Sequence, residues 1–138
     1  MEQYMAQQKD LEQYSSGDHN SLQTILIVED DVNIGEVLVQ AISQETSYFA
    51  VFVQNGFEAL KTVEGIKPSL FILDYHLPRM NGIELYDRLH AMPALVTIPA
   101  IMMSARLPQK ELANRQILGM NKPIDLDEFL QAIEQLLE

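Results

Sequence analysis

The sequence predicts an α/β domain: one open sheet of five parallel strands with helices on both faces. Short apolar runs alternate along the chain with segments of helical period, which is the pattern of successive strand and helix units. The chain has 138 residues and no cysteine, so one domain can bury a sizeable core without disulfide or thiolate-metal crosslinks. These two observations favour a single folded domain over a small crosslinked scaffold.

Each expected strand is a short apolar run bounded by polar or turn-forming residues. Because parallel strands are joined by right-handed crossovers, five such units favour the strand order 2-1-3-4-5 of the flavodoxin-like, doubly wound arrangement. The expected strands are Thr24–Val28, Phe49–Val53, Leu70–Leu73, Pro99–Met103 and a weaker one near Ile117–Met120.

Capping residues mark the starts of the expected helices. Asp31 precedes the first helix, and Asn55 with Glu58 begins the second. A third helix is expected from about Gly82 to His90, and Asp125 caps the last. The apolar stripes that these helices would bury comprise Ile34, Val37, Leu38, Ala41 and Ile42 in the first helix, Phe57, Leu60 and Val63 in the second, and Leu126, Phe129, Leu130, Ile133, Leu136 and Leu137 in the last.

Residues 1–21 are expected to form a flexible N-terminal extension, and residues 22–138 the folded domain. The extension is rich in Gln, Ser, Asp and Glu and has little to bury. Tyr4, Leu11 and Tyr14 can lie along one side of a short helix, so a weak homodimer through this segment is an alternative.

The formal net charge of -11 restricts the partners that the chain can take. This charge repels phosphate backbones, and no cluster of lysines or arginines offsets it, so direct nucleic-acid binding is not expected. No apolar run reaches the roughly 18 residues of a membrane span, and the N-terminus lacks the pattern of a signal peptide. The prediction is a cytoplasmic protein that binds other proteins and no membrane.

Polar side chains follow four of the five expected strands. Glu29 and Asp30 follow the first, Asp74 the third, Ser104 the fourth and Lys122 the fifth. Because the carboxyl ends of parallel strands share one edge of a sheet, we expect these side chains to meet in one pocket. The three carboxylates repel one another, and oxygen ligands favour Mg²⁺ or Mn²⁺ as the neutralising cation. Since Mg²⁺ typically takes one or two carboxylates, Asp30 and Asp74 are the expected direct ligands.

Such a pocket can support phosphoryl transfer to a carboxylate. Asp74 can act as the nucleophile, because the reaction needs an in-line oxygen and positive charge around the phosphoryl oxygens. The cation and Lys122 would stabilise two of those oxygens, and the Ser104 hydroxyl would donate a hydrogen bond to one of them. Ala105 is small and leaves space for a donor group to approach.

Together these motifs resemble the receiver domain of two-component response regulators, and the resemblance covers essentially all of the expected folded part. The family's acidic pair corresponds to Glu29 and Asp30 in Ile-Val-Glu-Asp-Asp. The phosphoacceptor corresponds to Asp74 in Leu-Asp-Tyr-His-Leu-Pro-Arg-Met-Asn-Gly. The switch hydroxyl corresponds to Ser104 in Met-Ser-Ala, and the lysine to Lys122 in Lys-Pro.

The resemblance implies a stand-alone receiver domain that a histidine kinase or phosphotransfer protein phosphorylates on Asp74 in a Mg-dependent reaction. It implies that the backbone carbonyl of His76 is a further metal ligand and that the bond between Lys122 and Pro123 is cis. The phosphorylated domain would signal through contacts with a downstream protein target. Beyond taking a phosphoryl group from a donor and losing it again, the chain would not be an enzyme.

The chain departs from the family pattern toward its C-terminal end. Ser104 and Lys122 are closer together in sequence than is usual, so the fourth helix and the fifth strand should be shortened. The family's switch Tyr or Phe would stand just before the lysine, where this chain has Gly119-Met-Asn121. His76 and Arg106 would flank the phosphoryl group and modulate the attack of water on it.

Two alternatives stay open at this point. A receiver-like scaffold would bind its partners independently of phosphorylation, as the missing aromatic switch and the shortened fourth helix suggest. An aspartate-nucleophile phosphatase is the other. Such enzymes carry a second aspartate two positions after the nucleophile, whereas here that position is His76.

Overall fold

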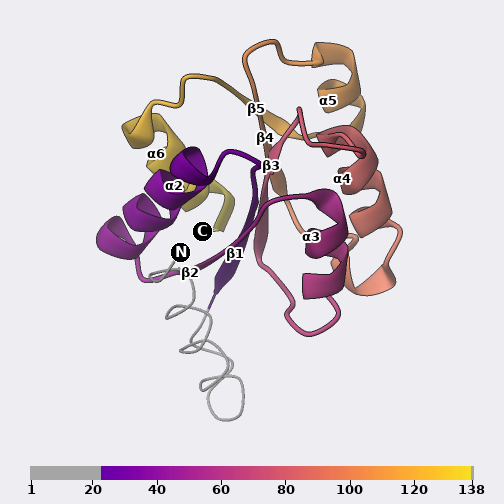
Figure 1. Ribbon diagram of the computed structural model, residues 1–138, viewed down its shortest axis with the longest axis horizontal. Helices are drawn as coiled ribbons and strands as arrows, with labels where there is room; N and C mark the ends of the chain where they lie inside the picture. Colours follow the sequence, from indigo (N-terminus) through magenta and orange to yellow (C-terminus); the bar gives the residue numbers. More distant parts are fainter. Residues whose placement is uncertain (1–22, 138) are drawn as a thin grey trace.

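The computed structural model describes residues 23–137, which form a three-layered domain around one parallel sheet (Figure 1). The sheet has the order β2-β1-β3-β4-β5, so the predicted strand order is confirmed. All four neighbouring pairs are parallel, and the fourth and fifth strands begin one residue later than expected. The strands are β1 (Thr24–Val28), β2 (Phe49–Val53), β3 (Leu70–Asp74), β4 (Ala100–Ser104) and β5 (Leu118–Asn121).

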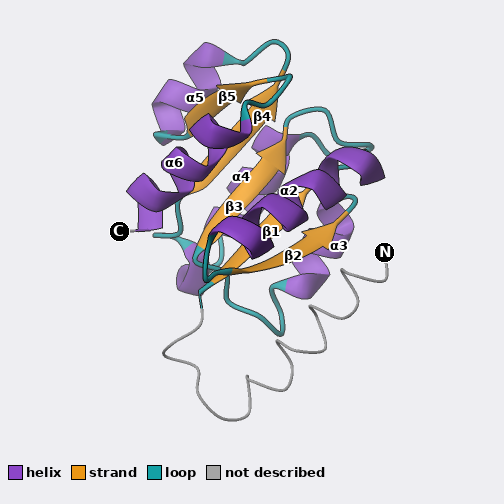
Figure 2. Cartoon of the chain, turned by 90° about the vertical axis from the view of Figure 1, so that its left-hand side faces the viewer, coloured by secondary structure: helices purple, strands orange, loops and turns teal. Residues whose placement is uncertain are grey.

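Helices cover both faces of the sheet, as predicted. Figures 1 and 2 show two helices, α2 and α6, on one face and the helices α3, α4 and α5 on the other. The fourth predicted helix, α5, has seven residues and β5 has four, so the expected shortening of both is confirmed. The helices are α2 (Val32–Glu45), α3 (Gly56–Thr62), α4 (Gly82–His90), α5 (Gln109–Arg115) and α6 (Leu126–Leu137), with a 3₁₀ turn, η2, at Pro93–Leu95.

Each face of the sheet has its own apolar core. Leu73 and Leu85 belong to the core beneath α3, α4 and α5, whereas Ile72, Leu38 and Phe129 belong to the core beneath α2 and α6. Successive side chains of a strand point to opposite faces, so neighbouring residues of β3 enter different cores. The central strands are therefore buried on both sides, which fixes the positions of the residues at their ends.

Three strands, β3, β4 and β5, end one residue later than expected. β3 continues to Asp74, which pairs with Met103, and β4 continues to Ser104, which pairs with Asn121 at the end of β5. Beyond this pair, the N–H of Lys122 donates to the Ser104 carbonyl over 3.0 Å. The backbones of these candidate site residues are therefore held by the sheet and not by a loose turn.

The predicted apolar stripe of α2 is wrong at Val37, which is 48% exposed. The helix approaches the sheet through Gly35, where an added Cβ would lie 2.1 Å from the Phe52 ring. Because of this close approach, the side chain of Val39 packs in the core, and that of Val37 does not. Periodicity alone could not reveal it, because the contact depends on a glycine facing an aromatic ring.

The stripe predicted for α3 is wrong at Phe57, which is 47% exposed. This helix packs through the small residues Gly56 and Ala59, both buried. The guanidinium of Arg79 lies 5.3 Å from the centre of the Phe57 ring, so the exposed aromatic has a cationic neighbour. Leu126, the first residue of α6, is also exposed, at 39%, although it was expected in the buried stripe.

The predicted helix caps are confirmed. The Asp31 carboxylate accepts hydrogen bonds from the N–H groups of Asn33 and Ile34 at the start of α2. The Asn55 side chain accepts one from the N–H of Glu58 at the start of α3. These caps satisfy N–H groups that a helix leaves without intrahelical partners.

The extension expected at residues 1–21, the helix considered there and the expected start of the domain at Leu22 lie outside the described residues. Within residues 23–137, no helix is long and apolar enough to cross a membrane.

Candidate functional site

The strands bring all the residues of the predicted pocket to one edge of the sheet. Glu29 and Asp30 directly follow β1, Asp74 and Ser104 end β3 and β4, and Lys122 directly follows β5. Glu29, Asp74 and Ser104 are buried, whereas Asp30 is exposed. The edge therefore combines buried carboxylates with an acidic residue that faces solvent.

Lys122 joins two of the carboxylates. Its Nζ lies 2.8 Å from Oε1 of Glu29 and 3.4 Å from Oδ1 of Asp74. Burial alone lowers the pKa of Lys122, but the hydrogen bond to Glu29 and the charges of both carboxylates outweigh it and raise that pKa above its ordinary value. The peptide bond that follows, between Lys122 and Pro123, is cis, as the family resemblance implies.

Glu29 is the most perturbed acid of the site. Burial raises its pKa to about 7, with a smaller contribution from the neighbouring Asp74, although hydrogen bonds from Lys122 and from the N–H of Asp31 act in the opposite direction. Its two carboxyl oxygens are both engaged, Oε1 with Lys122 and Oε2 with the Asp31 N–H at 3.1 Å. A buried carboxyl group with so strongly perturbed a pKa is typical of a functional site.

The three carboxylates are suited to a hard divalent cation. One oxygen each of Glu29, Asp30 and Asp74 lie within 4.8 Å of one another. Since Mg²⁺ binds oxygen at about 2.0 to 2.1 Å and keeps several waters, two direct carboxylate ligands and a third through water fit this spacing. Glu29, whose oxygens already accept hydrogen bonds, suits the more distant position.

The loop after β3 holds the Asp74 carboxylate in place. The N–H of His76 donates to Oδ1 of Asp74 over 3.1 Å. The N–H of Gly82, which begins α4, donates to the carbonyl of Tyr75 over 2.9 Å and so closes the loop. A Cβ at Gly82 would lie 2.6 Å from the Asp74 carbonyl oxygen, so only glycine fits this position without displacement.

Ser104 bonds within its own loop. Its hydroxyl donates to the carbonyl of Arg106 over 2.9 Å and accepts from the N–H of the same residue over 3.1 Å. The two residues that follow Ser104, Ala105 and Arg106, are exposed, as is His76 on the other side of the site. The effects expected of His76 and Arg106 on an attacking water stay predictions.

Sequence reasoning missed two features of this edge. It treated Gly82 only as a helix start, although the glycine lets α4 approach the backbone of Asp74. It also left Leu107 without a role, although this side chain fills the space beside Gly119. The fixed spacing between Asp74 and Gly82 in the motif could have indicated the role of Gly82. The role of Leu107 depends on a tertiary contact and has no such sequence signal.

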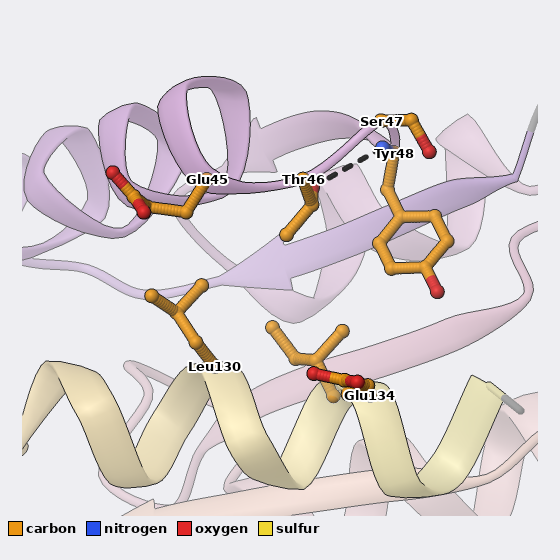
Figure 3. Close-up of a pocket in the computed structure, with 7 residues that line it drawn as sticks. Glu45, Thr46, Ser47, Tyr48, Leu130 and Glu134 are labelled. Carbon is orange, nitrogen blue, oxygen red and sulfur yellow. Dashed lines mark hydrogen bonds between the residues drawn. The ribbon is translucent and has the colours of Figure 1, made fainter.

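A cavity of about 210 Å³ lies between α2 and α6, and its lining includes none of the candidate site residues (Figure 3). Figure 3 shows Glu45, Thr46 and Tyr48 on one side of it and Leu130 and Glu134 on the other, with the N–H of Tyr48 bonded to the Thr46 hydroxyl over 3.1 Å. The segment from Glu45 to Tyr48 ends α2 and precedes β2, at the amino ends of the strands. This cavity is therefore not part of the candidate site.

An open parallel sheet with a carboxylate cluster, a hydroxyl and a lysine at its carboxyl edge defines an acidic, cation-compatible α/β site. The sequence pattern of the response regulator receiver domain matches residues 25–134. The chain is 30% identical over 115 residues to a 14.6 kDa uncharacterized protein of Leptolyngbya boryana, covering 80% of this chain and 87% of that one. It is also 30% identical over 117 residues to sporulation initiation phosphotransferase F of Bacillus subtilis, covering 82% and 92%.

Among solved structures, a CheY-like response regulator receiver domain protein from Methanospirillum hungatei JF-1 matches with a TM-score of 0.76 and 26% identity. The match covers 84% of this chain and 94% of the Methanospirillum chain. Other curated relatives are longer, and the chain spans 48% of one and 7% of another. The chain belongs to the response regulator receiver domain family of two-component systems.

Proposed function

We propose that the chain accepts a phosphoryl group on Asp74 from a histidine kinase or phosphotransfer protein, in a reaction that depends on Mg²⁺ or Mn²⁺. The observation that carries this proposal is the position of Lys122, whose ammonium lies 3.4 Å from Oδ1 of Asp74 and 2.8 Å from Glu29. A cation so close to a buried carboxylate is placed to stabilise a phosphoryl group on that carboxylate.

Oδ1 of Asp74 already faces Lys122 and the N–H of His76, so we assign the attack on phosphorus to Oδ2. With a phosphohistidine donor, a bond forms between this oxygen and phosphorus as the bond between phosphorus and the imidazole nitrogen breaks. The electron pair of the broken bond stays on that nitrogen, which leaves a neutral imidazole when the other ring nitrogen carries a proton. The carboxylate becomes an acyl phosphate, and the chain donates no proton.

The donor set fits the metal that the proposal requires. Asp30 and Asp74 would hold Mg²⁺ or Mn²⁺ directly, with the His76 carbonyl and a water on Glu29 as further ligands. A bound cation supplies positive charge to the carboxylates and to the phosphoryl oxygens. Ser104 would exchange its bond to Arg106 for one to a phosphoryl oxygen, because a hydroxyl carries a single hydrogen to donate.

The proposal includes a cytoplasmic location, a downstream protein target and no turnover beyond loss of the phosphoryl group to water. A second candidate is the phosphorylation-independent scaffold. The observation that favours it is Gly119, which stands where the family's aromatic switch residue is expected. The two candidates differ in whether Asp74 can be modified at all.

The test is the intact mass after incubation with acetyl phosphate and Mg²⁺. We expect the wild-type chain to gain one phosphoryl group, and Asp74→Ala or removal of the metal with EDTA to abolish the gain. Asp127→Ala, at an aspartate in the first turn of α6, is the matched control and should behave as wild type. A folded wild-type chain that gains no mass and binds no beryllofluoride would instead support the scaffold.

A further inference from the structure

The Ser104 hydroxyl is tied to the peptide that carries Leu107. It donates to the Arg106 carbonyl over 2.9 Å and accepts from the Arg106 N–H over 3.1 Å. The carbonyl of Arg106 and the N–H of Leu107 belong to one planar peptide unit. A rotation of this carbonyl away from Ser104 therefore moves the backbone of Leu107 with it.

Leu107 and Leu112 cover the position on β5 where a side chain is absent. A Cβ at Gly119 would lie 2.9 Å from Cδ1 of Leu107 and 2.8 Å from Cδ1 of Leu112. Leu112 is buried in the core beneath α3, α4 and α5, and Leu107 packs against the same core. The two leucines thus fill a site on β5 from the side of α5, which lies beside this strand in Figure 1.

We infer that Leu107 couples the Ser104 hydroxyl to β5, by packing on Gly119 only while Ser104 is bonded to Arg106. The inference deepens the proposed function and rests on it for the event that draws the hydroxyl away. Donation to a phosphoryl oxygen removes the bond to the Arg106 carbonyl, since the hydroxyl has one hydrogen. The freed carbonyl belongs to an exposed residue and can bond to water, so the peptide is able to turn.

The movement of Leu107 has a direct effect on β5 because no Cβ stands between the leucine and the strand. When Leu107 moves away from Gly119, it exposes the backbone of β5, the outer strand of the sheet, and one side of Leu112. Gly119, Leu107 and Leu112 would in this way couple the Ser104 hydroxyl to β5, in a chain that has no aromatic residue at the switch position before Lys122. The signal takes the form of apolar surface uncovered between α5 and β5.

The first experiment needs no phosphoryl mimic. Ser104→Ala removes the hydroxyl that holds the Arg106 peptide, and its effect is read from the amide signal of Gly119 and the methyl signals of Leu107 and Leu112 in NMR spectra. We expect these signals to shift in Ser104→Ala and to stay near their wild-type positions in Ser104→Thr, which keeps a hydroxyl. Unchanged Leu107 and Gly119 signals in a folded Ser104→Ala chain would overturn the inference.

The second experiment adds Mg²⁺ and beryllofluoride to the wild type, to Leu107→Ala and to Leu118→Ala. Leu118 precedes Gly119 but pairs with Ile101, which faces the α6 side, so its truncation is the matched control. We expect the mimic to shift the Gly119 amide in the wild type and in Leu118→Ala, and to lose this effect in Leu107→Ala. An equal Gly119 shift in Leu107→Ala would contradict the coupling.

The two experiments separate the inference from the function on which it rests. If beryllofluoride does not bind, the proposed phosphorylation fails, while the comparison of Ser104→Ala with Ser104→Thr still decides whether Leu107 is coupled to the hydroxyl. If the mimic binds and shifts the Asp74 and Ser104 amides but not that of Gly119, the function stands and the inference fails.

Discussion

The ammonium of Lys122 lies 2.8 Å from Oε1 of Glu29, a residue with no solvent exposure. This pair connects the end of β1 to the segment after β5, which are separated in the sheet by β3 and β4. Each group is satisfied by the other: the ammonium offsets the buried negative charge, and the carboxylate raises the pKa of the lysine. The same lysine also contacts Asp74, so the stability of the site and its proposed reactivity would depend on shared contacts.

Lys122→Met should reduce both stability and phosphorylation. It leaves Glu29 buried without its cationic partner, and we expect a loss of about 1 to 3 kcal/mol in the free energy of unfolding, measured by urea denaturation. The mass gain with acetyl phosphate should also disappear. Lys110→Met, at an exposed lysine of α5, should change neither quantity. A Lys122→Met chain of wild-type stability would show that Glu29 does not need its partner.

Asp30→Ala should stabilise the metal-free protein. Asp30 brings a carboxylate oxygen within 4.8 Å of those of Glu29 and Asp74, and like charges so close repel one another. We expect the Tm without metal to rise by about 2 to 4 °C, as removal of a modest repulsion would give. The increase in Tm on adding Mg²⁺ should become smaller than in the wild type.

Thermal unfolding with and without Mg²⁺ measures both effects in one series. A lower Tm for the metal-free Asp30→Ala chain, or an undiminished response to Mg²⁺, would contradict the repulsion argument. Asp127→Ala again serves as the control at an exposed aspartate outside the cluster.

Gly82→Ala should destabilise the fold through one methyl group. The added Cβ would lie 2.6 Å from the Asp74 carbonyl oxygen and 2.6 Å from Sδ of Met102, so the backbone or α4 must move. We expect a loss of about 1 to 3 kcal/mol, the usual cost of overpacking, in urea denaturation. At Gly65 nothing lies within 4 Å of an added Cβ, so Gly65→Ala should be close to neutral. Equal effects of the two substitutions would show that crowding at Gly82 is relieved without cost.

The ion pair between Asp87 on α4 and Arg115 on α5 should give a weak dependence of stability on acid pH. Arg115 Nε and Nη2 lie 2.7 Å and 2.9 Å from the two carboxylate oxygens of Asp87. The hydrogen bond from Arg115 lowers the pKa of Asp87 below its ordinary value of 3.8. The pair therefore contributes stability above the ordinary pKa of the aspartate, and this contribution is lost as pH falls through the lowered pKa.

Asp87→Asn removes that contribution. Because Asp87 is 51% exposed, solvent screens the pair, and we expect a difference of at most about 1 kcal/mol from the wild type at neutral pH. The difference should close as the pH is lowered below the ordinary pKa of the aspartate. Urea denaturation of both chains across this range measures it, and a difference that grows toward low pH would have the wrong sign for this ion pair.

The sequence predicts the sheet order and the gathering of the site residues because both follow from local pattern and chain topology. Asp74, for example, reaches the edge because an apolar run precedes it and a turn follows, and parallel strands then align the remaining partners. The sequence does not reveal which side of a helix faces the core where small residues set the approach. Val37 and Phe57 are exposed for this reason, since α2 and α3 pack through Gly35 and Gly56.

Contacts between residues distant in sequence also escape prediction. The hydrogen bonds of Ser104 to Arg106 and the packing of Leu107 on Gly119 depend on the conformation of one loop and on its distance from β5. No periodicity or motif encodes that distance. The short spacing between Ser104 and Lys122 and the absence of an aromatic residue just before Lys122 indicate that this region departs from the family pattern, but they do not show which contacts replace it.

The loop that connects α5 to β5 is only two residues long. α5 ends at Arg115 and β5 begins at Leu118, and the turn between them is made at Gln116, whose left-handed φ of 58° reverses the backbone in a single step. Neither element can be displaced far without pulling on the other. The two-residue connection thus ties the position of α5 to that of the outer strand of the sheet.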